Sequence, residues 1–583
     1  MRVYCLPSIL QISILNRFKF TLRNTLPFLI CIAIIIVFFN IVLKNAVNIP
    51  NGDDLYCLLL FTQKFQDAAG WQDRFSLLIQ QWVEHRIVYS RLTSLISFWI
   101  HGQVNFVTII LIGNLTLVGF TLLFWKLLRD IKVSAYYLIP VVLTLFSPVT
   151  YEANMWAGAS TVYMPVCFLA LLTVYLLTIP SPLGLICAVA TSILAAFSFG
   201  NGMFSFIAGL VVLLCQKKYK ESAGWLLMTI IIIPLYFYGF EAHSGTNAFS
   251  IKSFLKSPEY LFYNLFGFLG GTLDYLENVN APIAAGNIPA LVLGLVLSVA
   301  AVAGVYFFFL KKTTVTDHIN TRSKITWLGM VVFLGITAIT MAYARTSGES
   351  MNTLSSRYKI YSMIAFILVY WGSLMFFRKK TRVVIVFGSV SLVLLLFNYY
   401  VNYEKLVNYK SNFLSGLYNY RNDNQWVIYR HTSYYEGASL MISDSIKANP
   451  KPVYDFYSVF PELTHFALNK AQILNEVQVS EDCAPGKSNC VQIKSANYPH
   501  ISNFNRGIYL VVYNDQKILL FLADPLKNGR FNMLTNGNYF KDGFNLNTNF
   551  GGSLTKGASY KLAIFCPTEK ENIRRIDRIF HNI

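Results

Sequence analysis

The sequence is dominated by apolar runs that are long enough to cross a lipid bilayer. Hydrophobic residues make up 55% of the 583 residues, and charged residues make up only 13%. A water-soluble protein of this size needs far more charge to cover its surface, so the composition excludes an ordinary soluble fold. We therefore predict a polytopic α-helical membrane protein with about 11 transmembrane helices, at residues 27–43, 104–127, 135–149, 160–179, 183–198, 203–215, 223–240, 288–310, 325–344, 360–377 and 383–401.

The basic residues gather in short clusters between these runs. The net charge of +19 is therefore typical of topology signals in a bilayer protein, and no nucleic acid is expected as a partner. If the N-terminus is cytoplasmic, every basic cluster falls on the cytoplasmic side, at residues 2–23, 126–132, 217–220, 311–324 and 378–382. We expect no cleaved signal peptide, because the first apolar run continues without a small-residue cleavage site.

An odd number of spans places the C-terminus outside the cell membrane. The long apolar runs end near residue 401, so we predict a transmembrane domain at 1–401, with a long first exterior loop at 44–103, and an exterior soluble domain at 402–583. The exterior domain is expected to be α+β or β-rich. Alternating apolar residues predict its strands, and helical periodicity predicts its helices; the strands are placed at 507–513, 517–522 and 560–565, and the helices at 439–447 and 462–473.

Two cysteines of the exterior domain indicate an oxidising compartment. Cys483 and Cys490 flank a Pro-Gly turn, and this spacing suits a small disulfide loop. A metal site is weakly supported there, because no His/Cys pair has ligand spacing nearby; Cys566 has no assigned partner. Together with the lack of any eukaryotic targeting feature, this favours a multi-pass protein of a bacterial inner (cytoplasmic) membrane whose exterior side is the periplasm.

An acidic pair, Asp53 and Asp54, follows the first apolar run directly. Pro50 and Gly52 precede it and favour a turn at the membrane surface rather than a helix interior. Charge so close to hydrocarbon is costly, so such residues are functional candidates. A solvated acidic loop is the ordinary alternative.

Further acidic, basic and histidine side chains occupy other segments on the same predicted side. Each has an ordinary alternative as a solvated helix face, a helix cap or an anchor to lipid headgroups. Together they favour a cavity in which arginines hold a lipid-linked phosphate while a carboxylate accepts a hydroxyl proton. The candidates for substrate binding are Glu84, His85, Arg86, Glu152, Arg345, Arg357 and Tyr358.

This arrangement resembles the GT-C superfamily of integral membrane glycosyltransferases, which combine many spans with an acidic motif in a long first exterior loop. Among them the chain is most similar to bacterial enzymes that modify O-antigen, the outer part of lipopolysaccharide, or related surface glycans. The resemblance rests on the overall architecture, Asp53-Asp54, Arg345 and the Ser356-Arg357-Tyr358 run. No Trp-Trp-Asp tripeptide of the oligosaccharyltransferase type is present, which argues against protein N-glycosylation.

The resemblance implies a glycosyltransferase that moves a sugar from a polyprenyl-phosphate donor to an acceptor glycan outside the membrane. Asp53 would accept the proton of the acceptor hydroxyl and Asp54 would orient the acceptor or the base. Arg345 and Arg357 would stabilise the phosphate leaving group, and Glu84, His85 and Arg86 would shape the sugar site. No cofactor is implied with certainty, and a divalent metal stays open because members of the superfamily differ in metal use.

Two alternatives share the lipid-linked substrate. A flippase or transporter for lipid-linked sugars would keep polar residues near the bilayer midplane, often within internal repeats. The spans here are mostly apolar at mid-depth and the charges gather at one face, which favours an enzyme. A polysaccharide polymerase or ligase would use the same donors with a larger acceptor groove.

Overall fold

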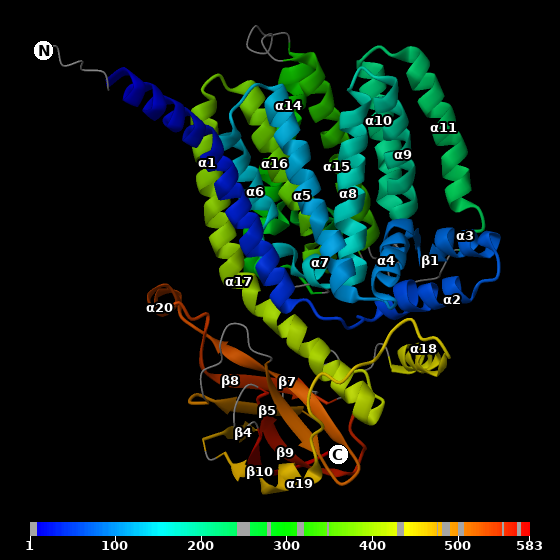
Figure 1. Ribbon diagram of the computed structural model, residues 1–583, viewed down its shortest axis with the longest axis vertical. Coiled ribbons are helices and arrows are strands. Elements are labelled where there is room, and N and C mark those ends of the chain that lie inside the picture. Colours follow the sequence, from blue (N-terminus) through cyan, green and yellow to red (C-terminus); the bar gives the residue numbers. More distant parts are fainter. Residues whose placement is uncertain are drawn as a thin grey trace, which may run out of the picture.

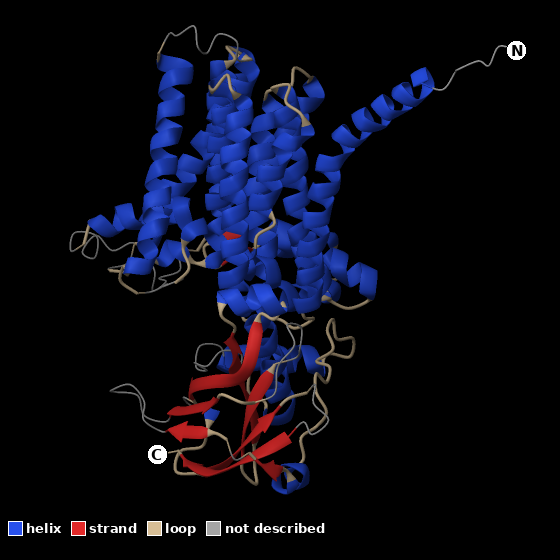
Figure 2. Ribbon diagram, turned by 90° about the vertical axis from the view of Figure 1, so that its left-hand side faces the viewer, coloured by secondary structure: helices blue, strands red, loops and turns tan. Residues whose placement is uncertain are grey.

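The computed structural model shows a helical membrane bundle with a β-rich domain at one end (Figures 1 and 2). The structure describes residues 8–241, 257–276, 281–311, 320–346, 349–427, 436–474, 476–480, 490–498, 507–550, 553–567 and 573–582. The start of α1 and the β-rich domain lie at opposite ends of the bundle (Figure 1). We call the end that carries the β-rich domain the exterior end, as the charge pattern of the sequence predicts.

Within the described residues, eight helices are long and apolar enough to cross a membrane. This confirms a multi-pass membrane architecture. They include α1 (Ser8–Asn45), α5 (Phe106–Asp130), α8 (Ala157–Leu177), α11 (Tyr219–Phe237), α14 (Ile288–Val305), α15 (Thr321–Arg345), α16 (Lys359–Phe376) and α17 (Lys380–Asp423). Two shorter apolar helices, α9 (Pro182–Ser198) and α10 (Phe204–Cys215), stand beside them (Figure 1).

The apolar run predicted to span at 135–149 does not form one continuous helix. It is divided into η2 (Ala135–Leu138), α6 (Ile139–Leu145) and η3 (Pro148–Thr150), and α7 (Tyr151–Met155) follows. Ser147 has extended backbone and its side chain accepts a hydrogen bond from the N–H of Val149, so the helix is interrupted just before Pro148. Proline has no N–H to continue a helical ladder and disfavours helical backbone in the residue before it.

Close helix crossing and a buried ion pair fix the helices around the start of α16. In α13 (Glu259–Gly270), a methyl group on Gly270 would come within 1.9 Å of the Ala290 carbonyl oxygen on α14, so only glycine permits this approach. Next to this crossing, the Lys359 Nζ atom lies 3.2 Å from the Asp274 carboxylate, and both side chains are fully buried. The first turn of α16 is thereby tied to the chain that follows α13.

The first exterior loop folds into short elements against the exterior end of the bundle (Figure 1). Both Trp71 and Phe75 on its amphipathic helix are exposed, as expected for a helix that lies in the membrane interface. The loop consists of η1 (Leu55–Leu60), α2 (Phe61–Asp67), α3 (Trp71–Ile79), β1 (Gln81–Trp82), β2 (His85–Arg86) and α4 (Val88–His101).

The C-terminal domain is a β-rich half-barrel, as the alternating sequence pattern predicted. Its eight described strands form one sheet in the order β3-β10-β9-β6-β7-β8-β5-β4, with β6 buried along its whole length. The strands are β3 (Gln472–Ile473), β4 (Gln478–Ser480), β5 (Cys490–Ser495), β6 (Ile508–Tyr513), β7 (Ile518–Lys527), β8 (Phe540–Asn549), β9 (Ser559–Phe565) and β10 (Ile573–His581). The accompanying helices are α18 (Glu436–Ala448), α19 (His465–Lys470) and α20 (Arg530–Asn536).

One helix, α17, belongs to both parts of the molecule. It passes the predicted domain boundary at residue 402 and continues to Asp423, where it packs against the sheet. The buried Asn419 side chain donates to the Leu520 carbonyl oxygen at 2.9 Å and accepts from the Leu520 N–H at 2.8 Å. The domain also contacts the first exterior loop, where the Tyr454 hydroxyl donates to the Asn48 carbonyl oxygen at 2.6 Å.

Candidate functional site

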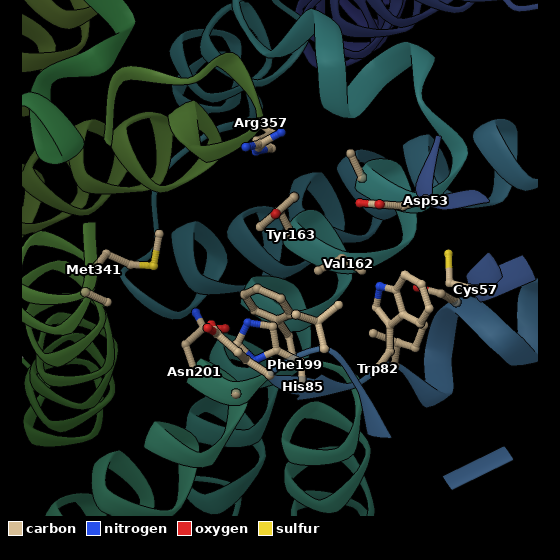
Figure 3. A pocket seen from close by; sticks show the side chains of 18 of the residues that line it. Asp53, Cys57, Trp82, His85, Val162, Tyr163, Phe199, Asn201, Met341 and Arg357 are labelled. Carbon is tan, nitrogen blue, oxygen red and sulfur yellow. The ribbon is translucent and has the colours of Figure 1, made fainter. Parts of the chain in front are cut away.

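A cavity of about 740 Å³ opens at the exterior end of the bundle. Its walls come from segments that are distant in sequence: the first exterior loop, α8, the turn η4 (Gly200–Met203), the ends of α11 and α15, and the segment before α16. Figure 3 shows polar and aromatic side chains around this space. Of the predicted site residues, those that line it are Asp53, Glu84, His85, Arg345, Arg357 and Tyr358; Asp54, Arg86 and Glu152 lie behind its walls.

Asp53 presents its carboxylate to the cavity (Figure 3). Burial raises the pKa of Asp53, and the nearby positive charge of Arg357 opposes this shift. No hydrogen bond to this carboxylate occurs among the described residues. An unengaged carboxylate in a partly dehydrated cavity is suited to accept a proton from a bound hydroxyl group.

Asp54 has the opposite environment. Its side chain is only 1% exposed, and its oxygens accept hydrogen bonds from the Asn51 N–H at 3.0 Å, the Trp156 Nε1–H at 3.0 Å and the Gly158 N–H at 2.8 Å. Burial raises the pKa of Asp54 to about 7, while these three donors act in the opposite direction. Asp54 therefore fastens the acidic turn to the start of α8 and does not face the cavity.

Glycine is required where Asp54 meets α8. A methyl group at Gly158 would lie 2.8 Å from the Asp54 Oδ1 atom, so a side chain there would displace the carboxylate from its backbone donor. The same turn is held from the other side, because the Asn51 side-chain amide donates to the Tyr409 hydroxyl on α17 at 2.8 Å. These contacts set the position of Asp53 relative to the rest of the cavity.

Glu152 acts on the cavity through the turn that carries Arg357. Its carboxylate accepts hydrogen bonds from the Ser355 hydroxyl at 2.8 Å and from the Arg357 backbone N–H at 3.2 Å. Its own N–H donates to the Ser356 hydroxyl oxygen at 3.0 Å. Glu152 therefore caps the short helix η9 (Ser356–Tyr358) and fixes the backbone from which the arginine extends.

Two guanidinium groups flank one aromatic ring in the cavity wall. The Arg357 and Arg345 Cζ atoms lie 5.3 Å and 5.8 Å from the centre of the Tyr358 ring, within the range of cation–π attraction. The Arg357 Nε atom is buried and has no hydrogen-bond partner in the part of the chain that the structure describes. Converging guanidinium donors of this kind recognise phosphate oxygens.

His85 lies deeper in the cavity, against an aromatic ring. Its imidazole centre is 3.9 Å from the centre of the Phe199 ring, and its Nδ1 atom is buried without a partner among the described residues. Burial, reinforced by the positive charge of Arg345, lowers the pKa of His85 to about 4. The imidazole is therefore uncharged near neutral pH, whereas its neighbour Glu84 is exposed at the cavity surface.

Arg86 supports the fold of the loop. Its Nε–H donates to the Tyr236 carbonyl oxygen at 2.7 Å, and a second nitrogen donates to the Tyr238 carbonyl oxygen at 2.6 Å. Another nitrogen donates to the Ile79 carbonyl oxygen. These bonds tie the β1–β2 hairpin to the end of α11, so the guanidinium that was predicted to shape the sugar site is directed away from the cavity.

Several cavity residues were not predicted from the sequence. Asn201 lies between two glycines in the sequence, a pattern typical of a turn, yet it lines the cavity. The others are mainly aromatic residues near the exterior ends of apolar segments, a pattern that is also ordinary for membrane-interface anchors and therefore carried no specific signal. They include Trp82, Trp156, Tyr163, Phe199, Tyr236 and Phe240.

The cysteine and metal predictions are only partly covered by the described residues. Cys483 and the side chain of Cys490 lie outside them, and Cys566 is buried in the β-rich domain. Among the residues that the structure describes, no group of three or more His, Cys, Asp or Glu side chains is arranged to hold a metal ion.

The cavity combines the Asp53 carboxylate, the two arginines Arg345 and Arg357, and an uncharged polar end. Asp53 and the arginines are close enough for the charge of Arg357 to act on the Asp53 carboxyl, so one bound molecule can contact both. Comparisons of the chain with protein-family models, with curated proteins and with solved structures find no match. The functional argument therefore rests on the geometry and chemistry of this cavity.

Proposed function

We propose that this protein is a membrane glycosyltransferase of the GT-C type, which moves a sugar from a polyprenyl-phosphate donor to an envelope glycan such as O-antigen. The observation that carries the proposal is the placement of Asp53 opposite Arg357 in one cavity at the membrane surface. A carboxylate that accepts a proton and a cation that stabilises a phosphate leaving group are the two functions that this transfer requires.

The phosphate of the donor binds between Arg345 and Arg357. Both arginines line the cavity beside the Tyr358 ring. Hydrogen bonds from guanidinium groups to phosphate oxygens are strong and directional, and they gain strength where bulk water is excluded. The same contacts stabilise the additional negative charge that the phosphate takes up as the sugar departs.

The reaction is a single displacement. The acceptor hydroxyl oxygen forms a bond to the anomeric carbon, and Asp53 takes the hydroxyl proton. The bond between the anomeric carbon and the phosphate oxygen breaks, and its electron pair leaves with the polyprenyl phosphate. Burial raises the pKa of Asp53, which makes the carboxylate a better base than a solvated one.

The prenyl chain of the donor has an apolar path from the cavity to the membrane. Phe237 and Phe240 near the end of α11, and Met341 on α15, line the cavity. On the same helices, Leu235 and Ile339 are exposed on the outer surface, where the bilayer surrounds the protein. A lipid tail therefore rests against apolar side chains while its phosphate reaches the arginines.

We propose that this cavity lies on the periplasmic side of a bacterial inner membrane, and the distribution of charge along the sequence supports this orientation. The basic clusters predicted to be cytoplasmic include Lys217 and Lys218, which follow α10 at the bundle end opposite the cavity (Figure 1). Nucleotide sugars are absent from the periplasm, so a lipid-linked donor fits this location.

The test of the proposal is the loss of sugar transfer in Asp53→Asn. This variant keeps the shape of the side chain and removes its basicity, so transfer from polyprenyl-phosphate sugars in membranes is expected to fall by about 10²–10⁴-fold. Asp73→Asn is the matched control, because Asp73 is an exposed acid of the same loop on α3 and does not line the cavity.

Two results would contradict the proposal. Full transfer activity in Asp53→Asn would exclude Asp53 as the base. Movement of a lipid-linked sugar across the membrane by the wild-type protein, with no new glycosidic bond detected by mass spectrometry, would instead establish the flippase alternative. In cells, the envelope glycan should lose the same sugar in Asp53→Asn as in a deletion strain.

A further inference from the structure

Three buried polar atoms without partners gather at the end of the cavity formed by β2, η4 and α11. They are the His85 Nδ1 atom, the Asn201 Oδ1 atom and the Tyr236 hydroxyl, and none has a hydrogen-bond partner among the described residues. Tyr236 is 1% exposed and Asn201 is 8% exposed. Buried polar groups in folded proteins are almost always paired, so three together indicate a place that a ligand fills.

Two of these atoms approach one point beside Gly200, and the third belongs to the residue that follows Gly200 in the chain. A methyl group at Gly200 would lie 3.0 Å from the His85 Nδ1 atom and 3.8 Å from the Tyr236 hydroxyl oxygen. Asn201 is the next residue, and Figure 3 shows its side chain beside His85 and Phe199. The absence of a side chain at Gly200 therefore leaves space between the groups, and the three residues come from separate segments of the chain.

The chemistry of this end differs from that of the arginine end. The Asn201 amide nitrogen already donates to the Tyr361 hydroxyl at 2.8 Å, which leaves its carbonyl oxygen as an acceptor toward the cavity. The imidazole of His85 is uncharged near neutral pH, because burial lowers its pKa to about 4. Uncharged groups that accept hydrogen bonds, together with a phenolic hydroxyl, pair with the hydroxyl groups of a ligand, which both donate and accept. A carboxylate only accepts, so it could not bind the Asn201 carbonyl oxygen.

Aromatic rings complete the surroundings. The Phe199 ring lies against His85 at an interplanar angle of 49°, and Trp82 lines the same cavity. Apolar rings combined with a few directed polar groups are the usual composition of a small-molecule site, and the C–H faces of a pyranose ring are suited to such surfaces.

We propose that His85, Asn201 and Tyr236 form a subsite that binds the hydroxyl groups of a neutral pyranose attached to the lipid phosphate. This inference rests on the proposed function, since it assigns the sugar of the same donor to the end of the cavity remote from the acidic turn. It names the class of sugar: an uncharged hexose or N-acetylhexosamine rather than a uronic acid.

The experiment measures binding in the Asp53→Asn background, so that no turnover is needed. The probes are citronellyl phosphate without a sugar and the same lipid phosphate carrying glucose, galactose, mannose, N-acetylglucosamine or glucuronic acid. We expect at least one neutral sugar to increase the affinity about 10-fold or more over the sugar-free lipid, as one or two directed hydrogen bonds would do.

The variants Tyr236→Phe and His85→Phe should remove most of this increase. Tyr236→Phe deletes only the hydroxyl oxygen, and His85→Phe replaces the imidazole by a slightly larger apolar ring. Binding of the sugar-free lipid phosphate should therefore stay within about 2-fold of the parent. Tyr238→Phe is the matched control. Tyr238 is 82% exposed, two residues from Tyr236, and it does not line the cavity.

The outcomes separate this inference from the proposed function. If the sugar-free lipid phosphate binds but no neutral sugar adds affinity, or if the increase survives in both variants, the subsite is refuted and the donor site stands. Tightest binding of the glucuronic acid conjugate would refute the neutral class. If no lipid phosphate binds and Asp53→Asn retains transfer activity, the proposed function itself fails.

Discussion

Asp53 and Asp54 are adjacent in the sequence, but only Asp53 faces the cavity, while Asp54 is buried under three N–H donors. The two carboxylates therefore have different environments, whereas the sequence led us to expect both to act at the substrate, Asp53 as the base and Asp54 in orienting the acceptor or the base. One carboxylate is available to a ligand, and the other holds the turn that presents it. Substitutions of these two residues should consequently fail in different ways.

Asp54→Asn should destabilise the protein. The amide would turn an –NH₂ group toward at least one of the N–H donors that the carboxylate now satisfies, and a buried unpaired donor costs about 1–3 kcal/mol. Thermal unfolding in detergent should show a lower Tm for Asp54→Asn and an unchanged Tm for Asp53→Asn. Equal Tm values for both variants would contradict the structural role of Asp54.

Arg357→Gln should weaken ligand binding, whereas Arg86→Gln should lower the stability of the fold. Arg357 lines the cavity with an unpaired Nε atom, so its loss should weaken binding of a short-chain polyprenyl phosphate by roughly 10-fold or more with little change in Tm. Arg86 donates to three backbone carbonyls, so its loss should lower the Tm and leave the affinity of the folded fraction unchanged. The reverse pattern would assign the phosphate contact to Arg86.

The stability of the wild-type protein should decrease as the pH is lowered, and His85 should account for part of this decrease. Burial and then the charge of Arg345 lower the pKa of His85 to about 4 in the folded chain, against about 6.5 in an unfolded chain. Between these values the unfolded chain binds a proton that the folded chain does not, so stability decreases as the pH falls through this window.

The Tm of His85→Phe should therefore decrease less than the Tm of the wild type as the pH falls from about 6.5 to about 4. Arg345→Gln should show an intermediate effect, because it removes one of the two causes of the shift. The difference between wild type and variant is the quantity to compare, since carboxylates elsewhere titrate in both proteins. Parallel curves would show that His85 is not buried as described.

Gly200→Ala should impair the recognition of the sugar while sparing that of the phosphate. The added methyl group would lie 3.0 Å from the His85 Nδ1 atom, in the space that the proposed subsite leaves for the ligand. Affinity for a sugar-bearing lipid phosphate should fall toward that of the sugar-free lipid. Gly335→Ala on α15 is the control, because a methyl group there meets no atom within 4 Å; equal losses in both variants would point to a general effect on the bundle.

The sequence predicted the membrane character, the exterior loop and the strands because each depends on local patterning. Long apolar runs specify helices in a bilayer whatever lies beside them, and the short run of β-branched and aromatic residues at 508–513 favoured the strand β6. The interruption of the run at 135–149 was missed, because its hydropathy outweighed the signal of Pro140 and Pro148. The continuation of α17 beyond residue 402 was also missed. The helix is more polar there, so its hydropathy gave no signal of a span, and the sequence does not reveal that the sheet covers this part of the helix.

The candidate site depended on contacts that no local pattern encodes. The charge of the Asp53-Asp54 pair marked a turn that borders the cavity. The separate environments of the two residues arise from Trp156 and Gly158, which are about a hundred residues away along the chain. Asn201 and Tyr236 resemble a turn former and an interface aromatic in sequence, and only their convergence beside Gly200 gives them a common surrounding. Arg86 was grouped with the site because of its charge and its proximity to Glu84 in the sequence, whereas it donates three hydrogen bonds to backbone carbonyls.

The length of α17 has a mechanical consequence. Its 44 residues correspond to about 66 Å of continuous helix, with one half in the bundle and the other half fastened to the sheet through Asn419. A helix without a break transmits rotation and translation from one end to the other. The β-rich domain is therefore not connected to the bundle through a flexible linker at this point. It stands at a set height and angle relative to the bundle, and therefore at a fixed distance from the cavity.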